Sequence, residues 1–153
     1  MISLPNSFIQ SIERNLGPEA AAFFEALKLD SPTSIRLNAA KPMERAPEWK
    51  PVSWCASGFY LPSRPVFTLD PLFHAGAYYV QEAASMFLEQ ILTQAVDRSQ
   101  ALTVLDLSAA PGGKSTHLAA LLSPHSLLVS NEVIRSRAKI LAENCTKWGA
   151  HNV

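Results

Sequence analysis

The chain has 153 residues, of which 48% are hydrophobic, 17% charged and 8% aromatic, and its 13 basic residues balance 13 acidic ones. Such a chain can form the core of one ordinary domain or of two small ones. The mean hydropathy is +0.07, and no apolar run approaches the roughly 18 residues of a membrane-spanning helix, which argues against a membrane protein. A net charge of zero argues against a histone-like or tail-type nucleic-acid binder, which needs excess Lys and Arg to neutralise phosphates.

The cysteines and histidines indicate neither a disulfide framework nor a metal site. Cys55 and Cys145 lie far apart, and the four histidines are scattered without the spacing of metal ligands. The segment MISLPNSFIQSIERN lacks the basic leader, apolar block and small-residue cleavage site of a signal peptide. We therefore expect a cytoplasmic protein that uses no metal ion and has no membrane partner.

The first half of the chain predicts short elements. Residues 8–16 and 20–27 carry apolar side chains at helical spacing on either side of Gly17 and Pro18, and they predict two short helices. Residues 34–38 alternate in polarity and predict a short strand. Seven of the eleven prolines fall between residues 32 and 71, which predicts loops and short edge strands there, because proline cannot donate to a central ladder.

From about residue 70 the pattern changes to long periodic elements. Residues 81–96 predict one amphipathic helix. The apolar runs at 102–107 and 127–131 predict parallel strands covered on both faces. Helices are predicted at 114–122 and 133–148, the second ending at Gly149 in a left-handed cap.

The order of these elements predicts an α/β fold of two parts. We expect a small N-terminal α/β domain over residues 1–68, followed over residues 69–153 by the first part of a Rossmann-like sheet, because strand, helix, strand, helix is half of a doubly wound domain. Two strands are fewer than an open sheet of this type usually has, and the strand at 102–107 would keep an open edge. We therefore expect that the chain is truncated at Val153.

The most informative segment is the loop Asp106-Leu107-Ser108-Ala109-Ala110-Pro111-Gly112-Gly113-Lys114-Ser115. Small residues between a buried strand and a helix let the backbone approach a ligand, and the free N–H groups of the helix start attract negative charge. One interpretation is a P-loop, G-x-x-x-x-G-K-[ST]. Its first glycine would fall at Ser108, however, and Pro111 removes a donor N–H from the phosphate cradle.

The other interpretation is a nucleoside-cofactor site of the Rossmann type. Glu132 ends the next predicted strand, nineteen residues after Gly113, close to the spacing of about 20 residues at which an acidic side chain binds ribose hydroxyls. Asp106 supplies a second acid beside the loop. Two acids suit a ligand with hydroxyls and a cationic end, such as S-adenosylmethionine, better than a triphosphate.

The loop also resembles a known family motif. Residues 106–115 are similar to D-x-C-A-A-P-G-G-K-[TS], the methyl-donor motif of the Sun/Fmu (Nol1/Nop2/Sun) family of S-adenosylmethionine-dependent RNA 5-methylcytosine methyltransferases, with Ser108 in place of the usual cysteine. Three further segments resemble family motifs: residues 131–153 (N-E-x-x-x-x-R onward), residues 76–86 (G-x-[FY]-Y-x-Q-[DE]) and residues 34–41 (S-x-R-x-N-x-x-K, from the RNA-binding domain).

The resemblance implies a role for specific residues. In the family, the loop surrounds the methionine part of S-adenosylmethionine, Glu132 would bind the ribose hydroxyls, and Arg137 would support that acid or the adenosine side. The cofactor-binding residues implied are Ser108, Ala109, Ala110, Pro111, Gly112, Gly113, Lys114, Glu132 and Arg137. Lys114 has the alternative of an ordinary solvated lysine.

The resemblance also implies an RNA partner, most simply ribosomal RNA. Arg36 is a candidate for a phosphate contact or for an internal ion pair. Tyr78 and Tyr79 are candidates for stacking on a base, or for anchoring a helix on the core.

The reaction implied is methyl transfer to C5 of cytosine, which in this family uses a cysteine nucleophile on a later strand. Cys145 falls on the apolar face of a predicted helix, and Cys55 has no base beside it in sequence, so neither is taken as that nucleophile. We expect the nucleophile beyond residue 153 and no catalytic residue in this chain, which alone should be inactive. The alternatives are a non-catalytic RNA-binding fragment and a P-loop NTPase or phosphotransferase.

Overall fold

The computed structural model describes residues 4–153 and divides the chain into two units, the first ending at Ser31 and the second beginning at Pro32. The first unit consists of α1 (Asn6–Leu16), the 3-10 turn η1 (Gly17–Glu19) and α2 (Ala20–Ala26). Gly17 ends α1 at a φ of 52°, and the rings of Phe8 and Phe23 lie 6.4 Å apart between the two helices. The two predicted N-terminal helices are confirmed.

The second unit opens with a four-stranded antiparallel sheet. Its strands are β1 (Ser34–Leu37), β2 (Lys50–Pro51), β3 (Gly58–Tyr60) and β4 (Tyr78–Val80), in the order β2-β3-β1-β4. Ile35 pairs with Phe59 on one side and with Val80 on the other. Ile35 and Phe59 form a core with Phe67 and Tyr78. Two short helices, η2 (Phe67–Leu69) and α3 (Pro71–His74), lie between β3 and β4 in the chain.

This sheet differs from expectation in two ways. The Pro-rich stretch was expected to supply only edge strands, but β3 is an interior strand; its three residues contain no proline, whereas Pro51 lies in the edge strand β2. The sheet also takes its fourth strand from residues 78–80, beyond the boundary expected at residue 68. That boundary between domains stays a prediction.

The single helix predicted over residues 81–96 is wrong, because the segment forms α4 (Ala83–Met86) and α5 (Leu88–Ala95) with a break at Phe87. Met86 is completely buried in a core with Val52 and Cys55. Leu88 and Leu92 pack instead against a core around Leu118 and Leu128. The two short helices therefore pack into different cores on either side of Phe87.

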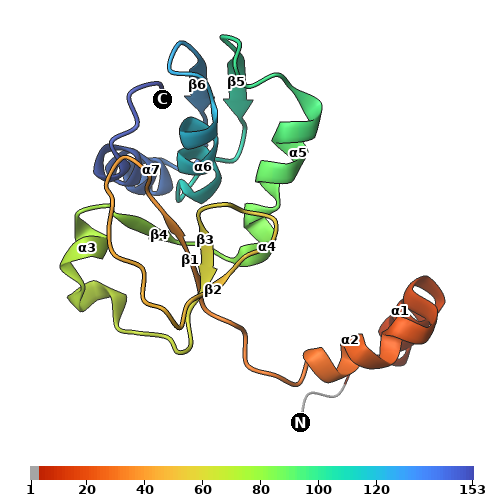
Figure 1. The fold of residues 1–153 in the computed structure, drawn as a ribbon. Helices are drawn as coiled ribbons and strands as arrows, with labels where there is room; N and C mark the ends of the chain where they lie inside the picture. Colours follow the sequence, from red (N-terminus) through yellow and green to blue (C-terminus); the bar gives the residue numbers. More distant parts are fainter. Residues whose placement is uncertain (1–3) are drawn as a thin grey trace. The chain divides into compact units, whose positions relative to one another are not determined.

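The rest of the second unit is the start of a Rossmann-like layer. The strands β5 (Thr103–Asp106) and β6 (Leu127–Ser130) are parallel and joined through α6 (Gly113–Leu121), and α7 (Arg135–Trp148) follows β6 (Figure 1). Gly149 ends α7 in the left-handed conformation, with a φ of 82°. Leu128 N donates to Asn152 O at 2.8 Å, so the chain after α7 returns beside β6. The predicted order of elements is confirmed.

One face of the β5–β6 pair is open in this structure, although both faces were expected to be covered. Leu105 and Val129 on the two strands are 56% and 47% exposed. The opposite face, which carries Val104 and Leu128, packs against α5 and α6. Within residues 4–153, the face with Val104 and Leu128 is therefore the one that contributes to a core.

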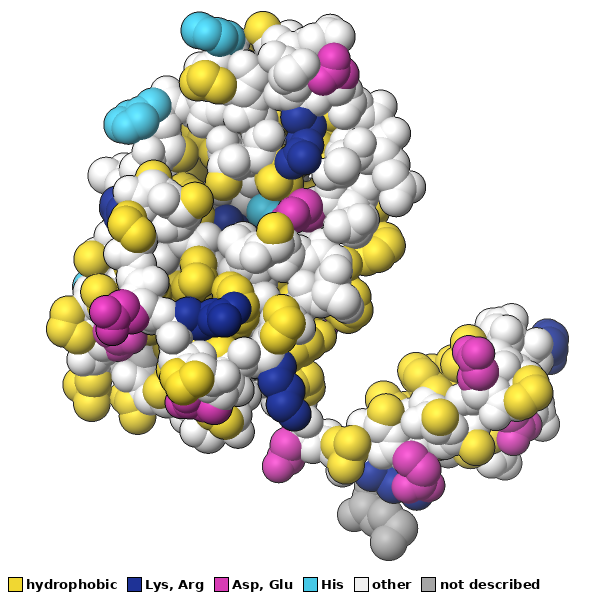
Figure 2. Space-filling model, viewed as in Figure 1, with side chains coloured by type: hydrophobic (Ala, Val, Ile, Leu, Met, Phe, Trp, Pro, Cys, Tyr) yellow, Lys and Arg dark blue, Asp and Glu magenta, His cyan; other side chains and the backbone are white. Residues whose placement is uncertain are grey.

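Charge is spread thinly over the surface. Figure 2 shows Lys and Arg side chains in small separate groups among acidic and hydrophobic ones, with no continuous basic patch on the face displayed. No helix in residues 4–153 is both long and apolar enough to span a membrane.

Candidate functional site

The loop of residues 108–114 connects the carboxyl end of β5 to α6, as the sequence predicts. Ala109 N donates to Asn131 O at 2.9 Å, and Asn131 N donates to Asp106 O at 2.8 Å, so the loop is bound to the end of the neighbouring strand. Ala109 and Ala110 are buried against Leu141 of α7. Larger side chains would not fit between the loop and that helix.

Gly112 is required by both its backbone conformation and its surroundings. Its φ is 113°, a value that residues with a side chain rarely adopt. A Cβ atom here would lie 3.3 Å from Leu141 Cδ1 and 3.5 Å from Asn144 Cβ. The α6 helix begins directly afterwards, so the free N–H groups of its first turn and the exposed Lys114 face the loop region.

Asp106 orders the loop through two hydrogen bonds. Its Oδ2 accepts from Ser115 Oγ at 2.8 Å, and its Oδ1 accepts from Ser108 N at 3.3 Å. Asp106 therefore joins the last residue of β5 to the first turn of α6. Each of its oxygens keeps a further lone pair for a ligand.

Glu132 and Arg137 lie beside the same loop. Arg137 Nη2 donates to Ala110 O at 2.8 Å, and Arg137 Nη1 lies 3.4 Å from Glu132 Oε2. The other carboxylate oxygen of Glu132 accepts from Ile134 N at 2.9 Å. The Glu132 side chain is only 4% exposed. Through its two contacts, the Arg137 guanidinium links this acid at the end of β6 to the backbone of the loop after β5.

A cavity of about 200 Å³ lies against the loop. We call it the loop cavity; it is lined by Tyr79, Val80, Gln81, Glu82, Ser85, Ser108, Ala109, Ala110, Pro111, Gly113 and Lys114. Six of the seven predicted loop residues therefore face one space, while Glu132 does not line it. The segment 79–82, which links the antiparallel sheet to α4, forms the opposite wall. Gln81, Glu82 and Ser85 were not predicted as site residues, because they are ordinary polar positions of a predicted helix.

Arg36, a candidate for a phosphate contact or an internal ion pair, is completely buried. Its Nε donates to Gln81 Oε1 at 2.9 Å, and its Nη2 donates to Thr116 Oγ1 at 2.7 Å. The same Nη2 lies 3.3 Å from Gly113 O, and the guanidinium is 4.4 Å from the Trp148 ring centroid. Burial lowers the Arg36 pKa to about 10, while the nearby Cys55, Tyr79 and Glu89 act to raise it. All these hydrogen-bond and ring partners are internal to the chain, and none of them is a carboxylate.

The other polar residues of the S-x-R-x-N-x-x-K segment also make internal contacts. Ser34 Oγ donates to Gln81 O at 2.6 Å. Asn38 Nδ2 donates to Gly76 O and to Trp148 O, at 2.9 and 2.8 Å. Lys41 Nζ donates to Lys147 O at 2.6 Å. The segment thus connects the antiparallel sheet to the carboxyl end of α7 and satisfies carbonyls that a helix end leaves unpaired.

The two tyrosines of β4 differ in exposure. Tyr78 is buried between Phe67 and Phe73, and its hydroxyl donates to Asp70 Oδ2 at 2.6 Å. Burial raises the Tyr78 pKa, and Asp70 raises it further. Stacking of Tyr78 on a base is therefore blocked in this structure. Tyr79 is half-buried, and its hydroxyl donates to Pro111 O of the loop at 3.2 Å. Strand alternation turns neighbouring side chains to opposite faces.

Cys55, Glu89 and His117 form a buried cluster that their separation in sequence concealed. His117 Nε2 lies 3.2 Å from Glu89 Oε2 and 3.8 Å from Cys55 Sγ, and the three ligand atoms lie within 4.8 Å of one another. Burial and the charge of Arg36 lower the His117 pKa to about 4, so the imidazole is neutral at pH 7. These distances are satisfied by hydrogen bonding alone, and the expectation that no metal is used stays a prediction.

Neither cysteine has the setting of a nucleophile. Burial raises the pKa of Cys55, and a hydrogen bond involving Glu89 raises it further. Cys145 on α7 is half-buried, and burial and the charge of Asp106 raise its pKa as well. A thiol with a raised pKa contains little thiolate at neutral pH.

Two family models match the chain. Residues 4–83 match the N-terminal domain of 16S rRNA methyltransferase RsmF, and residues 93–153 match 16S rRNA methyltransferase RsmB/F. The ribosomal RNA small subunit methyltransferase F of Shewanella loihica is 34% identical over 100% of this chain and 34% of its own length. The protein of the same name from Vibrio cholerae is 36% identical over 99% of this chain and 34% of its own length. The chain thus spans about a third of the length of these relatives.

A solved structure has a similar fold. The methyltransferase homolog protein from Pyrococcus horikoshii superposes with a TM-score of 0.72 and 26% identity, covering 98% of this chain and 55% of the other. Both units of the chain therefore have counterparts in one solved methyltransferase-like structure.

Proposed function

Because the chain belongs to the family of the 16S rRNA methyltransferase RsmF, we propose that it is the cofactor-holding part of an S-adenosylmethionine-dependent RNA (cytosine-5-)-methyltransferase acting on ribosomal RNA. Arg137 carries this proposal, because it binds the loop carbonyl of Ala110 and the carboxylate of Glu132 together. A loop after the first strand and an acid after the second are the two parts of a Rossmann-type nucleoside site.

The chemistry of the groups suits a cationic cofactor with ribose hydroxyls. S-adenosylmethionine, when bound, supplies a methyl group on a positively charged sulfur. In the proposed site Glu132 accepts hydrogen bonds from the ribose hydroxyls, while Arg137 holds its carboxylate in place. The buried Ala109 and Ala110 let the loop backbone approach the ligand, and the N–H groups at the start of α6 offer donors for its carboxylate end.

We further propose that the attacking cysteine lies outside this chain. Both cysteines within it have raised pKa values, and neither lines the loop cavity. The chain alone is then expected to bind cofactor without methylating RNA. Incubation with tritiated S-adenosylmethionine and cytosine-containing RNA tests this, and label in the RNA would contradict it.

Cofactor binding by calorimetry tests the site itself. Glu132→Gln is expected to weaken S-adenosylmethionine binding about tenfold or more, because a carboxylate accepting ribose hydroxyls is lost. Glu143→Gln is the matched control, since Glu143 is exposed on α7 and forms no ion pair within residues 4–153. Equal affinity in the wild type and Glu132→Gln would refute the ribose contact.

The P-loop alternative makes the opposite prediction for Lys114. An NTPase would bind magnesium ATP and lose most of that binding in Lys114→Ala, whereas the cofactor site proposed here binds ATP weakly with either residue. The position of Pro111 in the loop argues against a phosphate cradle, because proline lacks the N–H that such a cradle uses.

A further inference from the structure

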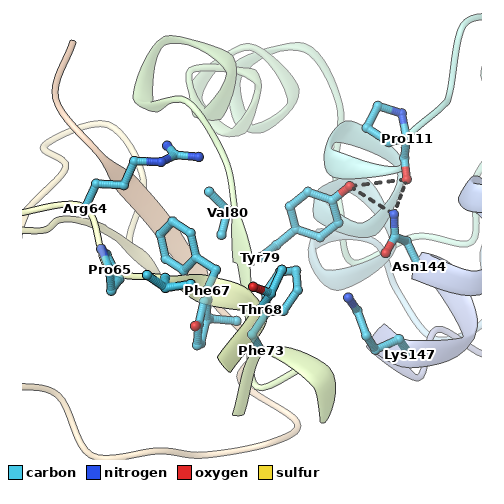
Figure 3. Close-up of a pocket in the computed structure, with 12 residues that line it drawn as sticks. Arg64, Pro65, Phe67, Thr68, Phe73, Tyr79, Val80, Pro111, Asn144 and Lys147 are labelled. Carbon is cyan, nitrogen blue, oxygen red and sulfur yellow. Dashed lines mark hydrogen bonds between the residues drawn. The ribbon is translucent and has the colours of Figure 1, made fainter. Parts of the chain in front are cut away.

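A second cavity, of about 670 Å³, adjoins the loop cavity and shares Tyr79, Val80 and Pro111 with it (Figure 3). We call it the flanking pocket. It is lined by Arg64, Pro65, Val66, Phe67, Thr68, Phe73, Tyr78, Tyr79, Val80, Pro111, Asn144 and Lys147. Its volume falls within the range of about 300–1,000 Å³ typical of ligand sites. The proposed methyl-transfer role of the loop does not use its far end.

Two cations without acidic partners stand at opposite ends of this pocket. In Figure 3, Arg64 and Lys147 flank a row of aromatic side chains. Lys147 Nζ lies 4.2 Å from the Phe73 ring centroid, and the Arg64 guanidinium lies 5.4 Å from that of Phe67. Within residues 4–153, neither cation has a carboxylate within 4.0 Å. Burial lowers the Lys147 pKa, a cost that an anionic ligand would offset.

One wall of the pocket offers a hydrogen-bond acceptor next to the loop. Asn144 Nδ2 donates to Pro111 O at 2.8 Å, and Tyr79 Oη donates to the same carbonyl at 3.2 Å. With its nitrogen bound to the loop, the Asn144 amide keeps its oxygen as an acceptor. In the described part of the chain that oxygen receives no hydrogen bond, so it is available to a base with an exocyclic amine.

We propose that the flanking pocket binds one nucleotide of single-stranded RNA adjacent to the cytosine that is methylated. Its base lies against the partly exposed rings of Phe73 and Tyr79, and its two phosphates reach Arg64 and Lys147. This adjacency rests on the proposed function, because it assumes that the target base meets the cofactor at the loop of residues 108–114. Aromatic rings between two cations match the alternation of bases and phosphates in a single strand better than they match an acidic peptide.

This assignment moves the RNA contacts away from Arg36 and Tyr78. Both of those side chains are buried, whereas Arg64 is exposed and Tyr79 and Lys147 are partly exposed. The pocket combines residues 64–80 with Pro111 and with Asn144 and Lys147 of α7, which lie more than 60 residues further along the chain. Only their packing in the fold brings them together.

The test measures binding of a fluorescent single-stranded RNA hexamer by anisotropy at several salt concentrations. Arg64→Met and Lys147→Met each keep most of the apolar stem and remove one charge. Each is expected to weaken binding about three- to tenfold and to reduce the salt slope by about 0.7, the value for one phosphate contact on a single strand. Lys139→Met is the matched control: Lys139 is exposed on α7, does not line the pocket, and its loss should change neither quantity.

A second measurement locates the base. A hexamer carrying one 4-thiouridine is irradiated on the wild-type chain, and the crosslinked peptides are identified by mass spectrometry. Crosslinks to residues 64–80 or to the peptide containing Lys147 are expected. The proposal would be overturned if crosslinks formed only elsewhere, or if the wild type bound no RNA. It would also be overturned if Lys139→Met and Lys147→Met lost the same amount of RNA affinity. Competition by poly-glutamate as effective as that by unlabelled RNA would overturn it as well, because the pocket would then bind any anionic chain.

Cofactor titration of the same variants separates the two proposals. If Lys147→Met loses RNA affinity but binds S-adenosylmethionine normally, the pocket proposal stands. If the wild type binds RNA through the pocket but binds no cofactor, the cofactor proposal fails while the nucleotide contact survives. If the cofactor binds and RNA affinity is unchanged in both Arg64→Met and Lys147→Met, the pocket proposal alone fails.

Discussion

Arg36 Nη2 lies 2.7 Å from Thr116 Oγ1 although 80 residues separate them, and this contact joins β1 to the first turn of α6. Thr116 Oγ1 in turn lies 2.8 Å from Gly112 O of the loop. The guanidinium therefore supports the start of the helix on which the proposed cofactor site depends. A buried cation in this position couples the antiparallel sheet to the Rossmann-like layer.

Replacing Arg36 should destabilise the second unit strongly. In Arg36→Met, the buried Gln81 Oε1 and Thr116 Oγ1 lose their charged donor, and leaving buried acceptors unpaired costs about 1–3 kcal/mol each. Urea unfolding followed by circular dichroism measures the loss. Arg45→Met is the control, since its cation lies 5.2 Å over Phe59 on the surface and should change the free energy of unfolding by less than about 1 kcal/mol. Similar losses in both variants would contradict the role of Arg36.

Adjacent glycines of the loop should respond differently to alanine. Gly112→Ala forces a side chain into a φ of 113° and against Leu141, with an expected cost of about 1–3 kcal/mol. Gly113 has no positive φ, and its added Cβ would meet the Tyr79 ring at an ordinary 3.4 Å, so Gly113→Ala should be close to neutral. Thermal melting compares the two variants, and equal melting temperatures would refute this account of Gly112.

The buried His117 should make stability depend on pH. Its pKa falls from 6.5 to about 4 on folding, because burial and Arg36 oppose its positive charge. Between these pH values His117 is protonated in the unfolded chain and neutral in the folded chain. Its contribution to the free energy of unfolding is therefore fully present above pH 6.5 and is lost as the pH falls toward 4. At 1.36 kcal/mol per pKa unit the loss is on the order of 3 kcal/mol.

Unfolding at pH 7 and pH 4.5 in His117→Gln and His125→Gln tests this dependence. The first variant should lose most of the difference between the two pH values. His125 lies exposed in the turn before β6, so the second should retain the wild-type difference. An unchanged pH dependence in His117→Gln would assign it to other groups.

The cysteines should react slowly with a thiol reagent. Cys55 is 2% exposed, and both thiols have raised pKa values, so alkylation by iodoacetamide at pH 7.5 should be about tenfold slower or more than in the urea-unfolded chain. Mass spectrometry should find Cys145 modified first. Rapid modification of Cys55 in the folded chain would show a reactive thiol that the structure does not contain.

Local sequence determined the elements and the loop that carry the proposed cofactor site. Apolar periodicity set the N-terminal helices, β5, β6 and α7, and the residues from Ser108 to Lys114 lie between β5 and α6 as predicted. Glu132 follows β6, so two parallel strands bring it to the same sheet edge as the loop. Each of these features depends on neighbours in the chain or on a single βαβ connection, which a sequence pattern records.

Only the tertiary structure decided which polar and aromatic side chains are accessible. Arg36 and Tyr78 were reasonable RNA contacts from the sequence, but both are buried. Arg36 on β1 packs against α6, and Tyr78 on β4 packs into the core beside Phe67. The segment of residues 81–96 is divided at Phe87 into two helices that pack into separate cores. Packing also brought together Arg64, Tyr79 and Lys147 around one pocket. Periodicity specifies which face of an element is apolar, whereas the contacts between distant elements decide what that face meets.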